Sequence, residues 1–482
     1  MKNWGLLACL FIATFTASAQ AVYTLEDCIR IALNENLGLR LAKLDIEQNA
    51  INLWQSRYNR VPSLGAGISQ GYNFGRSVDP STNQFISQTI RSNNLNLSSS
   101  VTLFNGFIIT NTISRNKKQV AASTLSLQKQ VNDLQLQIVQ GFLAASAAKQ
   151  QIAASADRIR QSKVLIERVD KQIAAGTAPM SAKYDLLAQQ ANENTLLIRN
   201  QNTYKQQLLT LKQLINLSQA ESFEIALPKE TKADSTYVPE KASAIFATAA
   251  ASLPEIRQAE QNVEVAQLSE RIARGSFYPT LSLNGNAFTN YSSARNRIIQ
   301  TNTGTPTNET IGLLTGTGDT VKVPLSLITS GTGNSFKTEK YPFSSQLSDN
   351  VSQSVSFQLT IPIFSNFRIR ANAKSASLGV RRAQLNLQNA KNVLMREIEQ
   401  AILDFETAKA TQQSLKAQKF ASAESLRMRE LRFNEGLLNQ ADYFFQRNEY
   451  DRVQRELLQA EFELIFRIKQ IDFYLGKPLG LN

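Results

Sequence analysis

The side chains that most often carry out chemistry in proteins are scarce in this 482-residue chain. It contains no histidine and only two cysteines, Cys9 and Cys28. Without imidazole there can be no histidine metal ligand and no Ser-His-Asp or Cys-His nucleophile. Paired carboxylates could still support acid–base hydrolysis, but the acidic residues form no pocket-like constellation. We therefore expect no enzyme, no catalytic or metal site and no cofactor.

One short stretch resembles a phosphate-binding loop. Residues 331–338 read GTGNSFKT, and they end in the expected Lys-Thr pair. However, Phe336 stands where such a loop needs its second glycine, and no strand precedes it in a βα context. The stretch therefore predicts no nucleotide site.

The first residues are typical of a secretory signal. Lys2 precedes an apolar run from Trp4 to Phe15, and residues 17–19 form a small-x-small cleavage motif. Residues 1–19 are thus the predicted signal peptide. Residues 6–9 also resemble a lipoprotein cleavage box, but lipidation at Cys9 is disfavoured because so little apolar sequence precedes it. Cleavage would leave Cys28 alone, so a monomer would hold no disulfide.

The chain is strongly basic, with a formal net charge of +13. Such an excess can indicate nucleic-acid binding. Here the charges are spread thinly along two proline-poor arms, and an export signal would remove most nucleic acid from reach. We interpret the excess as a solvated helix surface and expect no nucleic-acid partner.

The second half of the sequence repeats the first. Residues 103–104 align with 363–364 at an offset of 260, which holds without a gap for about seventy residues. Upstream, residues 36–40 align with 253–257 at an offset of 217. The difference between the two offsets places a single insertion between Pro279 and Phe364. A duplicated unit of this length indicates an architecture built from tandem elements rather than an enzyme fold.

Each half contains a long arm with the pattern of a coiled coil. No proline lies between Pro80 and Pro179 or between Pro362 and Pro478. Apolar residues recur every seven positions over about eight heptads. The first series is Val131, Ile138, Ala145, Ile152, Ile159, Ile166 and Ile173. Seventy helical residues would span about 100 Å, so each arm must pack sideways on other long helices.

Both arms stop at a glycine, Gly176 and Gly436, placed where a helix C-cap favours it. A shorter helical stretch follows each of them, at 181–216 and 440–475. Each half is therefore predicted to form a hairpin with one long and one short limb.

Four segments alternate between apolar residues and small polar ones. They are 64–74, 93–103, 281–291 and 351–364, and their polar faces carry Ser, Thr, Asn and Gly rather than Lys and Glu. This pattern is typical of transmembrane β-strands, although one-sided strands also cover soluble cores. Four strands cannot close a barrel, and an open sheet edge is not tolerated in lipid. Strands in a membrane would therefore have to be pooled between copies of the chain.

This order of elements resembles the TolC-type outer-membrane efflux channel family over essentially the whole mature chain. The most specific matches are residues 23–28 (YTLEDC), 34–37 (NENL), 103–106 (LFNG), 361–364 (IPIF) and 432–436 (RFNEG) with Asp442. The resemblance implies a mainly α fold with membrane β-strands. Two tandem helical hairpins per chain would build a periplasmic α-barrel, and four strands per chain would join a trimeric, 12-stranded transmembrane β-barrel.

The resemblance also implies a function and partners. It predicts an exit duct of a tripartite efflux or type I secretion system in the outer membrane of a Gram-negative bacterium, extending into the periplasm. The partners would be two further copies in a homotrimer, a periplasmic adaptor protein, an inner-membrane pump and outer-membrane lipid. A periplasmic adaptor and a coiled-coil scaffold remain as alternatives without channel activity.

The hairpin tips hold the candidate aperture residues Gly176, Asp185, Phe433, Gly436, Asp442 and Phe445. In the archetype of the family, acidic residues follow the second tip glycine at plus six and plus nine. Here these positions are Asp442 and Phe445. The family's tyrosine before that glycine is Phe433, and its arginine after it is Leu438. The links that close the archetype therefore do not carry over.

Each aperture candidate keeps two interpretations. Asp185 and Asp442 either form a ring that favours cations or are ordinary carboxylates at the start of a helix, where the macrodipole favours them. Phe433 and Phe445 either gate the aperture or pack within the coiled coil.

The resulting division of the chain is 1–19 signal peptide, 20–217 first repeat, 218–250 connecting segment, 251–475 second repeat with a long external loop at 292–350, and 476–482 tail.

Overall fold

The computed structural model describes residues 22–78, 83, 85–87, 89–217, 223–228, 237–301, 310–314, 320–324 and 335–480. The predicted signal peptide and Cys9 lie outside these residues, as do parts of the connecting segment, of the external loop with residues 331–334, and of the tail. The chain divides into two compact units. The helical unit is built from Met1–Trp54, Ile113–Glu270 and Lys374–Asn482, and the strand unit from Gln55–Thr112 and Arg271–Ala373.

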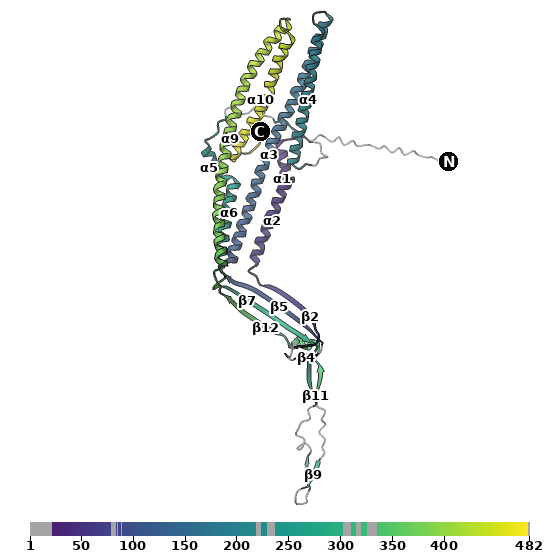
Figure 1. Ribbon diagram of the computed structural model, residues 1–482, viewed down its shortest axis with the longest axis vertical. Helices are drawn as coiled ribbons and strands as arrows, with labels where there is room; N and C mark the ends of the chain where they lie inside the picture. The colour runs from purple at the N-terminus through teal and green to yellow at the C-terminus, as the bar shows by residue number, and fades with distance from the viewer. Residues whose placement is uncertain are drawn as a thin grey trace, which may run out of the picture. The chain divides into compact units, whose positions relative to one another are not determined.

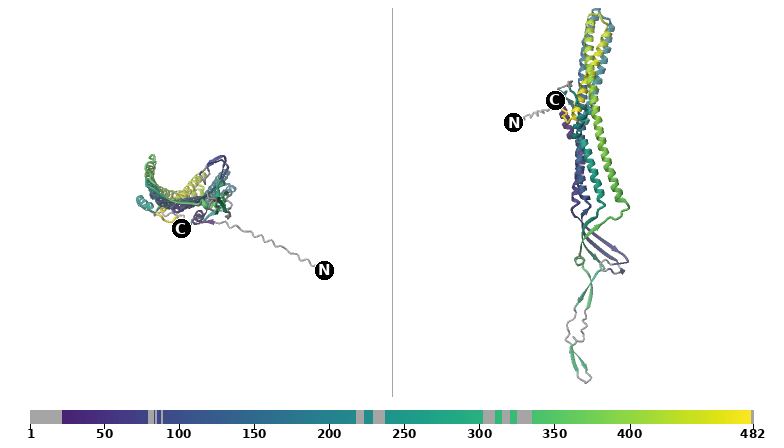
Figure 2. Two further views of the ribbon diagram at one scale, coloured as in Figure 1. Left: turned by 90° about the horizontal axis from the view of Figure 1, so that it is seen from below. Right: turned by 90° about the vertical axis from the view of Figure 1, so that its left-hand side faces the viewer.

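The duplication read from the sequence recurs element by element. Helices α3 (Ile108–Ala174) and α9 (Arg368–Asn434) both have 67 residues. Helices α4 (Met180–Leu214) and α10 (Gln440–Tyr474) both have 35. Members of each pair begin 260 positions apart, as the sequence alignment requires. Within the helical unit these helices run side by side as two hairpins (Figures 1 and 2), which confirms the tandem-hairpin prediction.

Shorter helices open each repeat at the other offset, 217. Helices α1 (Leu25–Glu35) and α5 (Ala242–Ser252) have 11 residues each. Helices α2 (Leu37–Tyr58) and α6 (Pro254–Gly275) have 22 each. A small parallel pair, β1 (Val22–Tyr23) and β6 (Glu224–Ile225), ties the start of the described chain to the connecting segment.

The repeats build two equivalent cores. In the first, Ile138 of α3 is buried among residues of α1, α4 and α10. In the second, the equivalent Ile398 of α9 is buried among residues of α5, α6 and α10. Both side chains are at most 1% exposed. Ile138 belongs to the apolar seven-residue series of the first arm, and Ile398 lies 260 positions after it. Burial of this kind contributes roughly 1.5–3 kcal/mol per large apolar side chain, so the heptad pattern is what holds the long helices to their neighbours.

The strand unit contains one four-stranded antiparallel sheet in the order β12-β7-β5-β2. Its strands are β2 (Ser63–Asn73), β5 (Ile90–Asn105), β7 (Thr280–Ser292) and β12 (Ser352–Thr360). The register aligns Phe357, Leu283 and Val101 in one row, so the apolar face is continuous across strands. Nothing in the described chain covers much of it: Ile68 is 79% exposed and Val355 is 75% exposed.

The predicted strand at 351–364 is too long. β12 ends at Thr360, before Pro362, because proline has no N–H to donate to a ladder. After it, Asn366 and Phe367 both have positive φ as the chain turns into α9. Gly106 and Phe107 do the same before α3, again 260 positions earlier.

The loops between strands contain short elements that the sequence analysis treated as loop. They are the hairpins β3 (Arg76–Val78) with β4 (Phe85–Ser87), β8 (Asn296–Thr301) with β11 (Ser335–Lys340) and β9 (Thr310–Leu314) with β10 (Thr320–Pro324), and the helix α8 (Phe343–Asp349).

Helix α8 protects an edge of the sheet. Gln346 is fully buried, its Nε2 donates to the Ser292 carbonyl, and its Oε1 accepts from the Ser292 N–H at 3.0 Å. One side-chain amide thus replaces a ladder partner where β7 extends beyond β12.

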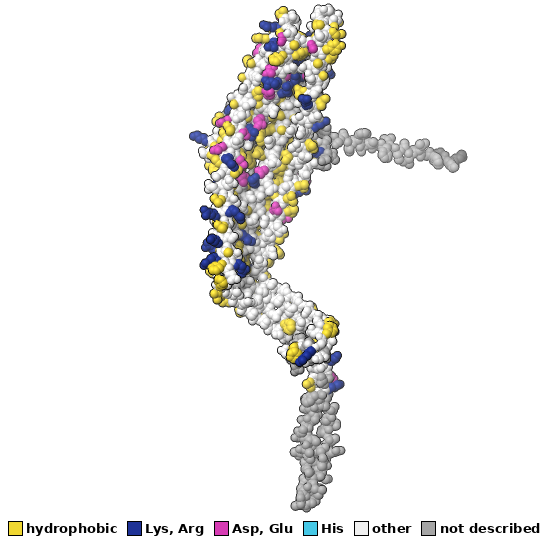
Figure 3. All heavy atoms as spheres, in the orientation of Figure 1, with side chains coloured by type: hydrophobic (Ala, Val, Ile, Leu, Met, Phe, Trp, Pro, Cys, Tyr) yellow, Lys and Arg dark blue, Asp and Glu magenta, His cyan; other side chains and the backbone are white. Residues whose placement is uncertain are grey.

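None of the helices in the described ranges combines the length and the apolar character needed to cross a membrane. Charged side chains of both signs are spread along the visible face of the helical unit, with Lys and Arg gathered over the first turns of α9 (Figure 3).

Candidate functional site

The two hairpin tips have the same backbone geometry. Gly176 and Gly436 adopt φ of +72° and +75°, which non-glycine residues rarely do. The Gly176 N–H donates to the Ile173 carbonyl, and the next N–H donates to Gln172, both at 2.9 Å. Gly436 and Leu437 repeat this pair with Phe433 and Arg432. This is a Schellman cap, which satisfies the last helix carbonyls and turns the chain back.

An apolar cluster joins the two hairpins near these tips. It contains Leu165, Val169, Leu186, Tyr443 and Phe444, with Phe433 packed against it. The Phe433 ring is stacked on Tyr443, with centroids 4.9 Å apart and planes 11° from parallel. In this single chain Phe433 is therefore engaged in packing. Phe445, by contrast, is 70% exposed.

Polar contacts reinforce the connection between hairpins. Arg168 of α3 donates to Asn434 Oδ1 at the end of α9 at 2.7 Å. Gln189 of α4 donates to Asn448 of α10 at 2.9 Å. Gln440, the first residue of α10, donates to the Ala182 carbonyl at 2.9 Å.

The two aspartates of the proposed aperture have different surroundings. The Asp442 N–H donates to Oδ1 of the N-cap residue Asn439 at 2.8 Å, and the Asn439 amide donates back to the Asp442 carboxylate at 2.7 Å. Asp442 therefore stabilises the start of α10. Asp185 is exposed on α4. Among the residues that the structure describes, no hydrogen bond or ion pair joins these two carboxylates.

A buried ionic cluster lies beneath the tips, and the sequence analysis missed it. Arg158 of α3 pairs with Asp451 of α10 at 2.8 Å, with side chains 13% and 9% exposed. Arg447 is buried beside them and donates to Gln161 Oε1 at 3.4 Å. A signal was present, because Arg447, Asp451 and Arg455 recur at every fourth position and so share one face of α10.

These charged groups line a cavity of about 470 Å³ between the hairpins. Burial raises the pKa of Asp451 above its ordinary value, against the attraction of Arg158, Arg447 and Arg455. Burial and the neighbouring Arg158 lower the pKa of Arg455. Here the loss of hydration outweighs the ion pairing, so the cluster is costly to bury.

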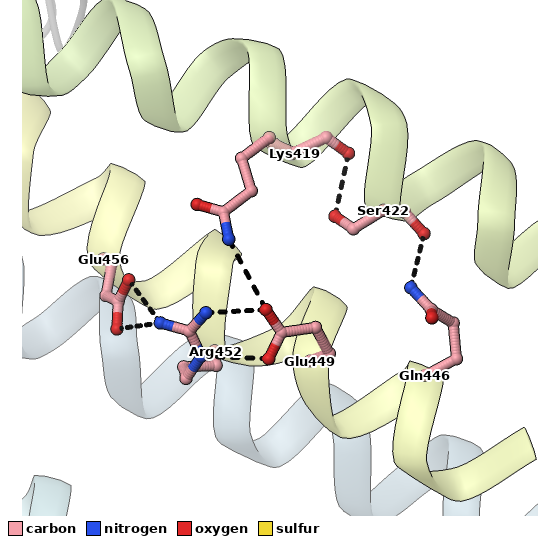
Figure 4. Close-up of polar contacts among 7 residues, drawn as sticks. Lys419, Ser422, Gln446, Glu449, Arg452 and Glu456 are labelled. Atoms are coloured by element: carbon pink, nitrogen blue, oxygen red, sulfur yellow. Dashed lines mark hydrogen bonds and ion pairs between the residues drawn. The ribbon is translucent and has the colours of Figure 1, made fainter. Parts of the chain in front are cut away.

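The second hairpin carries a further, exposed network between α9 and α10 (Figure 4). Arg452 donates to Glu449 on one side and to Glu456 on the other, at 2.6 Å and 2.7 Å. Gln418 of α9 donates to Glu449 at 3.4 Å. Exposed pairs of this kind contribute little to stability because water screens them.

Cys28 is fully buried, and this burial, together with Asp27 and Glu26, raises the pKa of its thiol to about 12. It is therefore a poor nucleophile. Within the described ranges, no three His, Cys, Asp or Glu residues are grouped as metal ligands.

Comparison with solved structures finds the same fold elsewhere. A membrane protein from Pseudomonas aeruginosa matches with a TM-score of 0.71 and 20% identity, covering 94% of this chain and 90% of that chain. The outer membrane protein VceC from Vibrio cholerae matches with a TM-score of 0.69 and 14% identity, covering 95% and 97%. The open state of the MtrE outer membrane channel from Neisseria gonorrhoeae matches with a TM-score of 0.67 and 18% identity, covering 95% and 90%. At these identities the likeness shows the fold.

The sequence itself supplies the family. No curated protein matches the chain significantly. The family model described as outer membrane efflux protein, however, matches residues 28–217 and 246–477, which together make up most of the chain. The resemblance inferred from the motifs is thus confirmed, and the adaptor and scaffold alternatives are not favoured. The chain belongs to the outer membrane efflux protein family.

Proposed function

We propose that three copies of this chain form a passive exit duct in the outer membrane of a Gram-negative bacterium. An inner-membrane pump would drive export through a periplasmic adaptor, in a tripartite efflux or type I secretion system. The helical units would extend into the periplasm, and residues 1–19 would be removed on export. Each copy would consist of two repeats, a connecting segment and a tail.

The observation that carries the proposal is the incomplete sheet. Among the described strands, β2 and β12 each pair on one side only, so the sheet has two open edges. Its apolar face is exposed, and its other face carries side chains such as Ser356, Asn284 and Ser100. A sheet with one apolar and one polar face fits a wall between lipid and water, provided that no edge stays open. Three copies would pool twelve strands and close the ring.

The helical unit also has two apolar surfaces that nothing in the described chain covers. Helix α2 exposes Leu37, Leu44 and Ile51 at seven-residue spacing, each 57–59% exposed. Helix α9 exposes Leu378 and Leu385, also seven apart, at 61% and 64%. Within the helical unit these two helices lie on opposite sides of the layer (Figure 1). An unpartnered heptad series favours a neighbouring helix, and a second copy supplies one.

In the assembled duct the hairpin tips would form the periplasmic aperture and the surface that meets the adaptor. Asp185 is the better candidate for a carboxylate ring, because the Asp442 carboxylate is already engaged in a helix cap. Phe445 is the better candidate for a gate or docking contact, because Phe433 is stacked on Tyr443. Opening would be a change in packing between hairpins, biased by adaptor contact.

Cysteine cross-linking tests the assembly. Helix α2 leads into strand β2, and helix α9 leads away from strand β12, so the two helices run in opposite directions. Leu41 of α2 should therefore lie at the level of Leu385 of a neighbouring α9. A Leu41→Cys/Leu385→Cys variant should give disulfide-linked dimers and trimers. The matched control is Leu41→Cys/Leu403→Cys. Leu403 is 56% exposed on α9 like Leu385, but it lies about 27 Å further along the helix, out of reach of position 41. A monomer in mild detergent, or equal cross-linking from position 403, would overturn the proposal.

Site-directed labelling tests the wall. Cysteines at 355, 357 and 359 should react with a lipid-restricted reagent, and cysteines at 356 and 358 with a water-borne one. Equal labelling of both sets by both reagents would exclude a lipid–water wall.

A further inference from the structure

All four strands of the sheet meet the helices at the same end. The register pairs Thr280, the first residue of β7, with Asn105 at the end of β5 and with Thr360 at the end of β12. Ser63, the first residue of β2, pairs with Ser100 of β5. We define the junction end as residues 57–62, 103–110, 271–280 and 360–370. Its segments are packed closely, since a Cβ on Gly106 would lie 2.2 Å from the Gly275 carbonyl oxygen.

The junction end is unusual in charge. Its four segments contain six arginines, namely Arg57, Arg60, Arg271, Arg274, Arg368 and Arg370, and no lysine, aspartate or glutamate. All six are exposed. Glu270 immediately precedes Arg271 in the sequence, whereas Arg57, Arg60, Arg368 and Arg370 have no acidic neighbour in the sequence.

These four arginines flank the two edge strands along the chain. Arg57, at the end of α2, and Arg60 precede edge strand β2, and Arg368 and Arg370 in the first turn of α9 follow edge strand β12. Closing the ring in the proposed function, on which this inference rests, brings β2 of one copy beside β12 of the next. Each contact between copies then holds four guanidinium groups whose junction segments supply no carboxylate. Like charges in such a site repel one another unless an anion lies between them.

Exposed aromatic rings accompany the charges. Phe364 and Phe367 form an edge-to-face pair and are 70% and 64% exposed, and Arg370 lies over the Phe367 ring at 5.9 Å. Phe104 and Phe107 form the same pair 260 positions earlier. Aromatic rings are enriched where a membrane protein crosses from hydrocarbon to headgroups. An anion held beside these rings is thus expected to carry acyl chains.

We propose that each contact between copies binds the headgroup of an anionic glycerophospholipid from the leaflet nearest the helical unit. The guanidinium groups would bind its phosphate with paired N–H donors, which is a geometry that arginine provides and lysine does not. The acyl chains would lie along the exposed apolar face of the sheet. The assembly would hold three such lipids, and each would join two copies.

Native mass spectrometry of the full chain in a neutral detergent tests the site. We expect three phosphatidylglycerol adducts per trimer at concentrations where phosphatidylcholine with the same acyl chains gives none. Changing Arg60, Arg368 and Arg370 to Gln should weaken phosphatidylglycerol binding about a hundred-fold, because it removes three basic groups that would attract the anionic headgroup. The same positions changed to Lys should retain part of the preference.

Arg427→Gln/Arg432→Gln is the matched control, since both arginines are exposed at the far end of the same helix α9. This variant should bind lipid as the unchanged chain does. A trimer that takes up both lipids equally, or that releases phosphatidylglycerol when inorganic phosphate is added, would overturn this site while leaving the duct intact. A monomer under all conditions would overturn the proposed function, and the lipid site with it.

Discussion

Arg158 and Asp451 form a buried ion pair between the two hairpins, with Arg158 Nη2 2.8 Å from Asp451 Oδ2. The pair connects α3 of the first repeat to α10 of the second. This contact is ionic, whereas the heptad contacts that hold the helices together elsewhere are apolar. Because both side chains are largely removed from water, removing one partner leaves an uncompensated charge in a poorly hydrated site.

We expect Asp451→Ala to destabilise the contact between hairpins by about 3–5 kcal/mol, the usual cost of breaking a buried pair. Replacing both partners, as in Arg158→Met/Asp451→Leu, should recover part of this loss because neither charge of the pair remains, while Arg447 stays buried beside them. Thermal unfolding of the purified protein measures both effects.

Arg452→Ala is the control for that experiment. Arg452 follows Asp451 directly, but its bonds to Glu449 and Glu456 lie on the exposed side of α10. Its loss should leave the melting temperature nearly unchanged. A larger effect at 452 than at 451 would contradict the assignment of the buried pair as the main polar link.

Two glycines with similar backbone angles should respond differently to alanine. Gly436 has open space around it, so Gly436→Ala should cost only the strain of a left-handed residue, about 1–2 kcal/mol. Gly106 has φ of +63°, and an added Cβ would also collide with the Gly275 backbone. We expect Gly106→Ala to reduce assembly sharply, as measured by the yield of the oligomer in the outer membrane. Equal yields for the two variants would show that the contact between residues 106 and 275 adjusts easily.

Stability should depend on pH through Glu255 in the first turn of α6. Burial, with Glu397 nearby, raises the pKa of its carboxyl against the attraction of Lys129. The folded chain thus holds this proton more tightly than the unfolded chain does. The resulting stability is present below the ordinary pKa of glutamate and is lost as the pH rises through the raised value.

Glu255→Gln removes that dependence. We expect the variant to gain stability over the unchanged chain as the pH rises from about 4 to about 7, across the usual range of a glutamate carboxyl. Melting temperatures of the two proteins across this range provide the measurement. A difference that stays constant with pH would show that Glu255 is not the group responsible.

The parts of this fold that follow a period could be predicted from the sequence. Ile138 and Ile398 are buried at equivalent places in the two repeats. A seven-residue apolar repeat keeps the same helix face against its neighbours, so the period also predicts the packing. Gln346 shows the opposite case. Its role as a substitute ladder partner for Ser292 depends on a contact 54 positions away, which no local pattern encodes. The ion pair between Arg158 and Asp451 was not predicted for the same reason. The four-residue spacing around Asp451 shows which residues share a face of α10, but it does not identify the helix that this face contacts.

The two aspartates at the hairpin tips differ in their surroundings, and this difference leads to a test of ion selectivity. Asn439 caps α10 by accepting from the Asp442 N–H, whereas Asp185 is exposed and outside such a cap. We expect Asp185→Asn to lower the cation preference of the duct in planar bilayers because it removes three carboxylates, one per copy, from the aperture. Asp442→Asn should chiefly weaken the helix start, by about 1 kcal/mol, with a smaller change in selectivity. If selectivity followed residue 442 instead, the Asn439 cap would have to open in the assembled protein, and the ring would belong to the second repeat rather than the first.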